Sequence, residues 1–165
     1  GTARTMRGRV YGGGTLVQDA QDWYAQDDAG NVWYLGEAVD DYNFDAAGGL
    51  IDITHDGSWE SGLDVAGIGV IARPGFIMKA SPAAGDVYHQ EFYKNEAEDM
   101  AVIVAVDVAI QLADGRTFLC VQTRDFSSLD ATINGYKFFS AGVGLVAEQA
   151  VDGADRVELT SAVGG

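Results

Sequence analysis

The sequence predicts an all-β fold, an antiparallel β-barrel or strongly curved β-sandwich of about ten to twelve strands with at most one or two short helices. Two observations support this prediction. The chain of 165 residues contains 22 Gly but only 2 Pro, a composition typical of short strands joined by tight turns. Several segments alternate apolar and other residues with a period of two, which indicates strands rather than helices. The length suits one domain spanning residues 1–165.

Turn residues divide the first half of the chain into extended segments. Trp23–Gln26 and Val32–Leu35 flank a short loop at 27–31, where Gly30 or Asn31 can adopt a left-handed conformation, and this pattern predicts a hairpin. The segment 55–74 is rich in Gly and shows no period, which predicts a long loop; loops of that length are usually functional or mobile. The other strands expected in this half lie at 5–11, at 15–26 and on both sides of a turn at 45–49.

The second half contains the clearest strand pattern. From Met100 to Leu112 every second residue is Val, Ile or Leu, which predicts that 102, 104, 106, 108, 110 and 112 share one face of a strand. Asp114-Gly115 predicts a two-residue turn that places Ile110 opposite Leu119. Acidic residues at 95–100 indicate a single helical turn. The remaining strands are expected near 76–78, 87–93, 131–140, 143–150 and 156–160.

The charge of the chain restricts its partners and its location. With 10 Lys and Arg against 25 Asp and Glu, the net charge is −15, which repels nucleic acid and anionic membrane surfaces. No apolar run reaches the length of roughly 18 residues needed for a transmembrane helix. The single Cys120 cannot form an internal disulfide. Strong acidity with few Lys favours an extracytoplasmic location, whether periplasmic, lipid-anchored or secreted.

Aromatic residues are the first candidate ligand site. In the hairpin around 27–31, Trp23 and Trp33 fall on one face and Tyr24 and Tyr34 on the other, whereas a simple solvated sheet carries large rings on one face only. Such rings can stack on sugars or enclose an apolar ligand, and the alternative is a well-filled core. The candidate ligand-binding residues are Trp23, Tyr24, Trp33, Tyr34 and Trp59.

A spacing of acidic residues suggests a second site, for Ca²⁺. Asp41, Asn43 and Asp45 alternate along the chain, and Asp52 occupies the twelfth position of the same window, as in the loop of an EF-hand. Ala46 stands where that loop requires Gly, and Asp52 is shorter than the usual Glu. The alternative interpretation is a polar hairpin without metal.

His89 and Glu91 are the candidate catalytic residues. They lie two apart on an expected strand, so that they share a face with Tyr93 and are positioned for acid–base chemistry. The alternative is the solvated face of a strand on an acidic protein. No set of Cys and His shows the spacing of a zinc site, and no cofactor other than Ca²⁺ is indicated.

Several stretches resemble a known family. Residues 22–27 and 30–37, which read DWYAQD and GNVWYLGE, together with 57–62 and 89–93, are similar to an uncharacterised family of bacterial exported or lipid-anchored proteins. Residues 136–146 are similar to the last strands of periplasmic half-open, lipocalin-like β-barrels. The resemblance implies an envelope location and a barrel-like fold, but no activity. Family members often carry a basic residue at the position of His89, which argues against an obligatory catalytic base there.

These patterns lead to three functional hypotheses. The preferred one is an extracytoplasmic binding module for a small apolar or carbohydrate-like ligand held by aromatic side chains, with residues 55–73 as a lid. In that case Trp33→Ala or Trp59→Ala abolishes binding and leaves the fold intact. The second is an enzyme that uses His89 and Glu91 as acid and base in the mouth of a barrel. The third is a Ca²⁺-dependent structural surface module.

Overall fold

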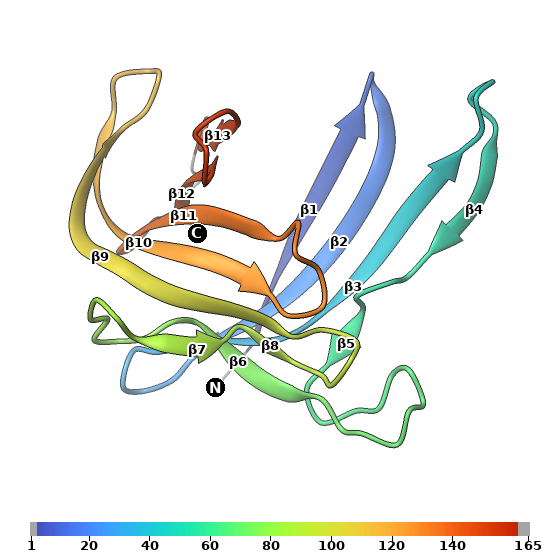
Figure 1. Ribbon diagram of the computed structural model, residues 1–165, viewed down its shortest axis with the longest axis horizontal. Coiled ribbons are helices and arrows are strands. Elements are labelled where there is room, and N and C mark those ends of the chain that lie inside the picture. The colour runs from blue at the N-terminus through green and yellow to red at the C-terminus, as the bar shows by residue number, and fades with distance from the viewer. Residues whose placement is uncertain (1–2, 162–165) are drawn as a thin grey trace. The chain divides into compact units, whose positions relative to one another are not determined.

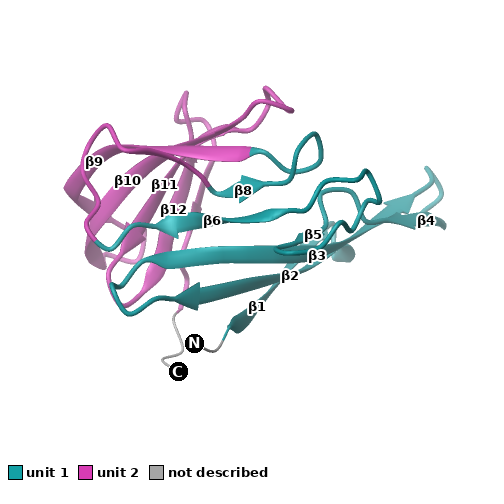
Figure 2. Ribbon diagram, turned by 90° about the horizontal axis from the view of Figure 1, so that it is seen from below, with its two compact units in different colours: residues 1–80, 90–98 teal, residues 81–89, 99–165 magenta. Residues whose placement is uncertain are grey.

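The computed structural model describes residues 3–161 of the chain. The described residues form thirteen β-strands and no helix, so none of them forms a helix that could span a membrane. The all-β, antiparallel prediction is confirmed. The chain divides into two compact units (Figure 2): unit 1 comprises the residues up to Ala80 together with Gln90–Glu98, and unit 2 comprises Ser81–His89 together with the residues from Asp99 onward.

Unit 1 contains a seven-stranded antiparallel sheet (Figure 1). Its strands follow the order β1-β2-β3-β6-β8, and β4 and β5 pair with β3 beside this path. The two predicted hairpins are present, since β2 pairs with β3 across the loop at 27–31 and β3 pairs with β4 across the turn at 45–49. The strands are β1 (Arg4–Gly12), β2 (Thr15–Gln26), β3 (Val32–Phe44), β4 (Leu50–Thr54), β5 (Trp59–Glu60), β6 (Arg73–Met78) and β8 (Glu91–Phe92).

Unit 2 contains a six-stranded antiparallel sheet. Its strand order is β13-β12-β11-β10-β9-β7, so that the last five strands in the sequence are sequential neighbours and β7 joins the outer side of β9. The strands are β7 (Val87–His89), β9 (Asp99–Gln111), β10 (Thr117–Ser127), β11 (Asn134–Ser140), β12 (Gly144–Ala150) and β13 (Arg156–Glu158).

The prediction of a closed barrel is wrong. Among the described residues each sheet is open, with β1 and β8 as the ends of one strand order and β13 and β7 as the ends of the other. Closure of a barrel requires the first and last strands of one continuous sheet to pair. The strand predicted at 87–93 is instead divided at Gln90 into β7 and β8, which belong to different sheets. The strand order is therefore interrupted where a barrel would have to continue.

Two local predictions also fail for reasons of backbone geometry. The expected helical turn at 95–100 is a tight reversal, in which Tyr93 and Ala97 exchange backbone hydrogen bonds and Asn95 has a φ of 63°. The turn before β10 has three residues rather than two, because the Leu112 N–H donates to the Arg116 carbonyl. Ile110 therefore lies opposite Phe118 and not opposite Leu119.

Strand β9 changes its buried face part-way along its length. Ala101 and Ile103 are buried near its start, whereas Leu112 is buried just beyond its end. The pairing of β9 with β10 shifts twice between these points, and Asp107 has a φ of 57° there. The most buried positions therefore change from odd to even numbers along β9, so residues 102–112 do not form one buried row.

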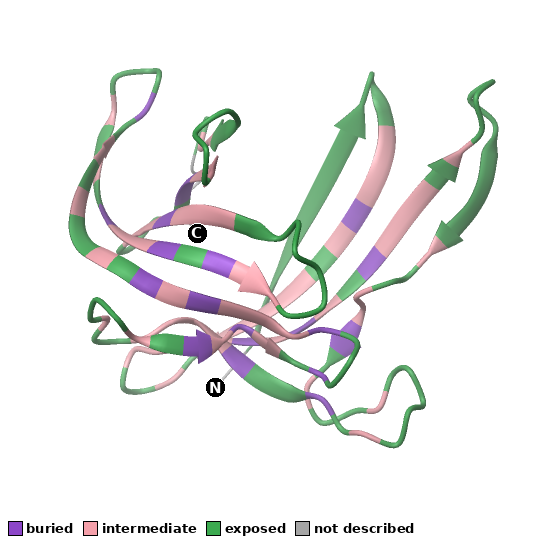
Figure 3. Cartoon of the chain, in the orientation of Figure 1, coloured by how far each residue is buried: buried purple, intermediate pink, exposed green. Residues whose placement is uncertain are grey.

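Each unit has its own hydrophobic cluster. In unit 1, Trp59 and Tyr93 are at the centre of a cluster with Tyr34, Ala72 and Ala97. In unit 2, the cluster consists of Leu112, Cys120, Phe138, Val146 and Ala147. Strand β1 contributes to neither, since all nine of its residues are exposed (Figure 3).

Candidate functional site

The aromatic residues of the first hairpin lie close to where the sequence predicts them. Tyr24 is opposite Tyr34 and Ala25 is opposite Trp33, which confirms the predicted assignment of these residues to two faces. The rings of Tyr24 and Tyr34 stack with centroids 4.9 Å apart, and Tyr34 meets Trp59 edge to face at 5.3 Å. The Tyr34 hydroxyl donates to Asp22 at 2.7 Å. Burial raises the pKa of both tyrosines.

The opposite face of the hairpin carries Trp33. Its ring packs against Phe76 at a centroid distance of 4.0 Å, and its Nε1–H donates to Asp27 Oδ2 at 2.9 Å. Hydrogen bonds from Asn31 and Trp33 lower the pKa of Asp27 to about 2. Trp23 is half-buried and lies opposite Gly36, next to a shift in the β2–β3 register. Trp33 is thus fixed by a ring contact and a hydrogen bond within unit 1.

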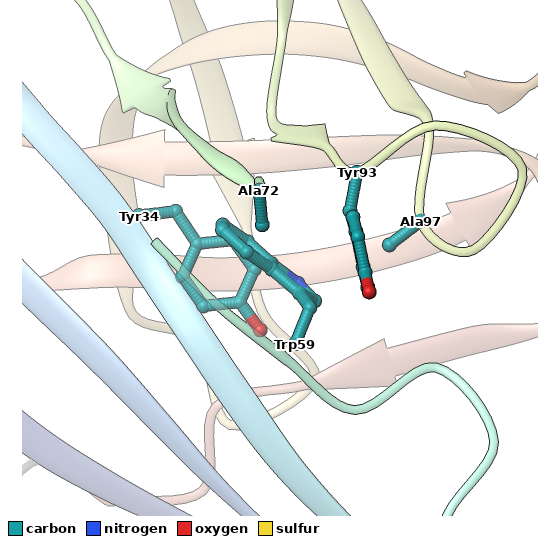
Figure 4. Close-up of a cluster of buried hydrophobic side chains, with 5 residues drawn as sticks. All are labelled: Tyr34, Trp59, Ala72, Tyr93 and Ala97. Atoms are coloured by element: carbon teal, nitrogen blue, oxygen red, sulfur yellow. The ribbon is translucent and has the colours of Figure 1, made fainter. Parts of the chain in front are cut away.

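Burial favours the core interpretation for part of the aromatic set. Trp59 is 1 % exposed and Tyr34 is 5 % exposed, and both belong to the cluster that also contains Tyr93 and Ala72 (Figure 4). A ring with so little exposed surface does not present a face on which a sugar can stack. Loss of Trp59 would therefore disturb the fold of unit 1, contrary to the expectation that Trp59→Ala leaves the fold intact.

The four candidate Ca²⁺ ligands do not converge. Asn43 lies opposite Asp52 in the β3–β4 pair, whereas Asp45 accepts hydrogen bonds from the backbone of Ala47 and Gly49, both at 2.8 Å, and Asp41 accepts one from Gln18 at 2.9 Å. Extended backbone separates alternate residues by about 7 Å, whereas a loop that binds Ca²⁺ curls around the ion. No group of three or more His, Cys, Asp or Glu in the part of the chain that is described could hold a metal ion.

The two candidate catalytic residues lie in different strands. His89 ends β7 and lies opposite Met100, while Glu91 begins β8 and lies opposite Pro74. Their expected placement on one face depended on a continuous strand at 87–93, and this strand is divided. The prediction of one strand that carries both residues is therefore wrong, and their role as acid and base stays a prediction.

A cleft in unit 2 is a candidate site that the sequence patterns did not indicate. It has a volume of about 270 Å³ and lies over strands β9 to β13. Its lining carries four carboxylates and one ammonium group. The charged lining residues are Asp99, Asp125, Lys137, Glu148 and Asp155.

The pairing of the strands places these charges in one row. Ser127 is opposite Asp99, Asp125 is opposite Gly135, and Lys137 is opposite Glu148. Residues directly opposite each other, and residues two apart on one strand, share a face of a sheet. Asp99, Asp125, Lys137 and Glu148 therefore project from the same face of four neighbouring strands.

An ion pair is at the centre of this row. Lys137 Nζ lies 3.0 Å from Asp125 Oδ2, and Thr123 donates its hydroxyl to Asp125 Oδ1 at 2.7 Å. Asp125 is 5 % exposed and Thr123 is completely buried. A buried charge is tolerated only when it is paired and hydrogen-bonded, so these contacts explain how a carboxylate can lie inside the sheet.

Burial and neighbouring charges shift the pKa values of two lining residues, Asp99 and Lys137. Burial raises the pKa of Asp99, with a further contribution from the negative charges of Asp125 and Asp130. Burial opposes the charge of Lys137, but the attraction of Asp125, Glu148 and Asp99 outweighs burial and raises the pKa of that ammonium. Lys137 consequently stays charged, and the surplus of carboxylates makes the cleft attractive to a further cation. Groups with shifted pKa values in a cleft are candidates for function.

Comparisons of this chain with protein-family models, with curated proteins and with solved structures find no match. The resemblance to exported bacterial proteins therefore stays a prediction. A function is therefore inferred from the geometry of each unit.

Proposed function

We propose that this chain is an extracytoplasmic binding module for a small organic cation, which binds in the cleft of unit 2. The observation that supports the proposal is the charge of the cleft: four carboxylates line it, and Lys137 is the only cationic side chain among its lining residues. A cleft lined by one sign of charge concentrates ligands of the opposite sign. The extracytoplasmic part of the proposal is supported by the acidic composition with few Lys and by the resemblance to exported bacterial proteins.

The size and spacing of the carboxylates favour an organic cation over a metal ion. Among the described residues no three acidic or histidine side chains converge tightly enough to hold a metal, whereas a volume of about 270 Å³ admits a molecule of several heavy atoms. A short diamine, with one ammonium at each end, satisfies carboxylates that lie several strands apart.

Calorimetric titration with 1,4-diaminobutane tests this proposal, with neutral 1,4-butanediol as the matched compound. We expect the diamine to bind and the diol not to bind. Glu148→Gln removes one lining charge without changing its size, and should weaken diamine binding about tenfold, equivalent to about 1.4 kcal/mol. Asp52→Asn removes the same charge from an exposed residue of unit 1 and should leave the affinity unchanged.

Two results would contradict a cation site in the cleft. One is equal binding of the diamine and the diol, because the carboxylates would then contribute nothing. The other is an equal loss of affinity in Glu148→Gln and Asp52→Asn, because binding would then follow the overall charge of the chain rather than the lining of the cleft.

A further inference from the structure

The loop that follows β5 closes over the aromatic cluster of unit 1. Its two ends are joined by backbone hydrogen bonds, from Gly62 N–H to the Ala72 carbonyl and from Ala72 N–H to the Leu63 carbonyl, both at 2.9 Å. Val70 and Ala72, near the end of the loop, pack against the cluster that contains Trp59. The loop from residue 61 to residue 72 is therefore a closed flap with a narrow base.

The phenol of Tyr93 links this loop to the turn at 93–97 by hydrogen bonds. The hydroxyl of Tyr93 donates to Asp64 Oδ1 at 2.6 Å and accepts the Ala66 N–H at 2.8 Å. The carboxylate of Asp64 in turn accepts the backbone N–H groups of Ile68 at 3.0 Å and Gly69 at 2.8 Å. Tyr93 is completely buried, whereas the bonds of this latch that Asp64 accepts from Ile68 and Gly69 are exposed.

Apart from Val70 and Ala72, the apolar side chains of the loop are exposed. Leu63, Val65 and Ile68 are 49 %, 52 % and 42 % exposed, so these apolar side chains do not pack into the cluster. Gly67 and Gly69 have φ values of 68° and 80°, in the left-handed region. A segment with few buried apolar contacts opens at a lower free-energy cost than the strands around it.

Beneath the loop lies a buried donor without an acceptor. Trp59 is 1 % exposed, and no described residue accepts a hydrogen bond from its Nε1. Figure 4 shows its indole between Tyr34 and Tyr93, with the nitrogen on the side of Tyr93. A buried N–H group that lacks an acceptor is costly, and an acceptor supplied from outside would remove this cost.

We propose that the loop is a hinged cover, and that its opening admits a small apolar ligand to the side of Trp59 that faces Tyr93, where the carbonyl oxygen of the ligand accepts the hydrogen bond of Trp59 Nε1. The site belongs to unit 1 and does not depend on the cation cleft of unit 2. The aromatic rings supply the apolar contact, and Trp59 Nε1 selects ligands that carry an acceptor. A hydrocarbon of the same size leaves the indole N–H unpaired and binds more weakly.

The test follows the indole N–H signals of ¹⁵N-labelled protein by NMR during titration with acetophenone, with ethylbenzene as the matched hydrocarbon. Trp23→Phe and Trp33→Phe identify the Trp59 signal by elimination, so that the buried indole itself need not be changed. We expect acetophenone to shift the Trp59 signal downfield with saturation, and ethylbenzene to leave it almost unchanged.

A variant that lacks the Tyr93 hydroxyl tests whether the loop from residue 61 to residue 72 acts as a cover. Tyr93→Phe keeps the ring but removes the hydroxyl, and should speed hydrogen exchange of the Ala66 and Gly69 amides and tighten acetophenone binding about threefold, because the open state is more populated. Tyr11→Phe removes a hydroxyl from an exposed residue of β1 and should change neither. Asp64→Asn weakens the same latch from the other side and replaces Tyr93→Phe if that variant does not fold.

Some results would overturn the proposal. A long-lived water in contact with the Trp59 N–H, with no response to acetophenone in the wild type or in the latch variants, would show that the donor is already satisfied. Unchanged exchange of Ala66 and Gly69 in both latch variants would show that Tyr93 does not hold the loop.

Discussion

Asp27 illustrates how a single side chain fixes a turn and an aromatic ring together. Its carboxylate accepts the backbone N–H of Asn31 at 2.9 Å, the side-chain amide of Asn31 at 2.8 Å and the indole N–H of Trp33 at 2.9 Å. Gly30, between them, has a φ of 95°, as expected from the sequence. Trp33 is therefore held by the loop that the sequence predicts, although its hydrogen bond was not predicted.

The lowered pKa of Asp27 gives the stability of unit 1 a specific dependence on pH. Its pKa of about 2 in the folded chain lies below its value in an unfolded chain, about 3.9. The ionised group therefore stabilises the fold above about pH 4, and this contribution is lost as the pH falls toward about 2. We expect Asp27→Asn to unfold at a lower temperature than the wild type at pH 6, and this difference to shrink below pH 4.

Thermal unfolding followed by circular dichroism at several pH values measures this difference. Asp28→Asn, an exposed neighbour of the same charge, is the control and should behave like the wild type. A difference between Asp27→Asn and the wild type that stayed constant from pH 6 to pH 2 would contradict the assigned role of the carboxylate.

Irregularities decide how the strands of this fold pair. In unit 1 the β2–β3 register shifts beside Trp23, and Gly36 on β3 has a φ of 147°. In unit 2 the pairing of β9 with β10 shifts twice near Asp107, which has a φ of 57°. The period of two in the sequence predicts the long strands but not β5, which lies in the segment 55–74 predicted as a loop. It assumes regular pairing, so it cannot show where a bulge interrupts the alternation.

Gly36 on β3 allows a test of how closely β3 and β5 approach each other. A Cβ added there would lie 2.4 Å from the carbonyl oxygen of Trp59 and 2.9 Å from the Cα of Glu60, and backbone atoms cannot yield as a flexible side chain can. Since the φ of Gly36 is also unfavourable for other residues, Gly36→Ala should lower the free energy of unfolding by about 3 kcal/mol. Urea unfolding followed by tryptophan fluorescence measures the change.

Gly8 on β1 is the matched control for Gly36. A Cβ added to Gly8 would have no neighbour within 4 Å, and its φ is not left-handed, so Gly8→Ala should change the free energy of unfolding by less than about 0.5 kcal/mol. Equal effects of the two substitutions would show that the β3–β5 approach is not tight.

Charge is the dominant property of the molecule as a whole. The net charge of −15 is spread over two open sheets, each with its own hydrophobic cluster. Like charges repel one another in the folded chain and destabilise it, and salt screens that repulsion. The chain should therefore be more stable at high ionic strength than at low ionic strength.

Raising NaCl from ~20 mM to ~500 mM should increase the Tm by a few degrees, because the Debye length falls well below the spacing of surface charges. Differential scanning calorimetry measures the shift. CaCl₂ at matched ionic strength is the control, and should raise the Tm no more than NaCl does. A Tm that falls with NaCl would contradict the repulsion argument, and a larger effect of CaCl₂ would revive the Ca²⁺-dependent surface module.

Local sequence patterns are sufficient to predict the all-β class and the hairpins around residues 27–31 and 45–49. These features depend on neighbours a few residues apart, because turns need particular backbone angles and strands repeat every two residues. For the same reason, the alternation along the first hairpin is enough to place Tyr24 and Tyr34 on one of its faces.

Long-range packing, by contrast, is what makes the chain form two open sheets and brings Asp99, Asp125, Lys137 and Glu148 to one face of the second sheet. These four residues come from four strands, and their meeting depends on strand order and register. Register shifts between β9 and β10 and between β11 and β12 decide which residues lie opposite one another, and no local period encodes them. The same holds for Trp59, because only the folded loop shows that its N–H is buried.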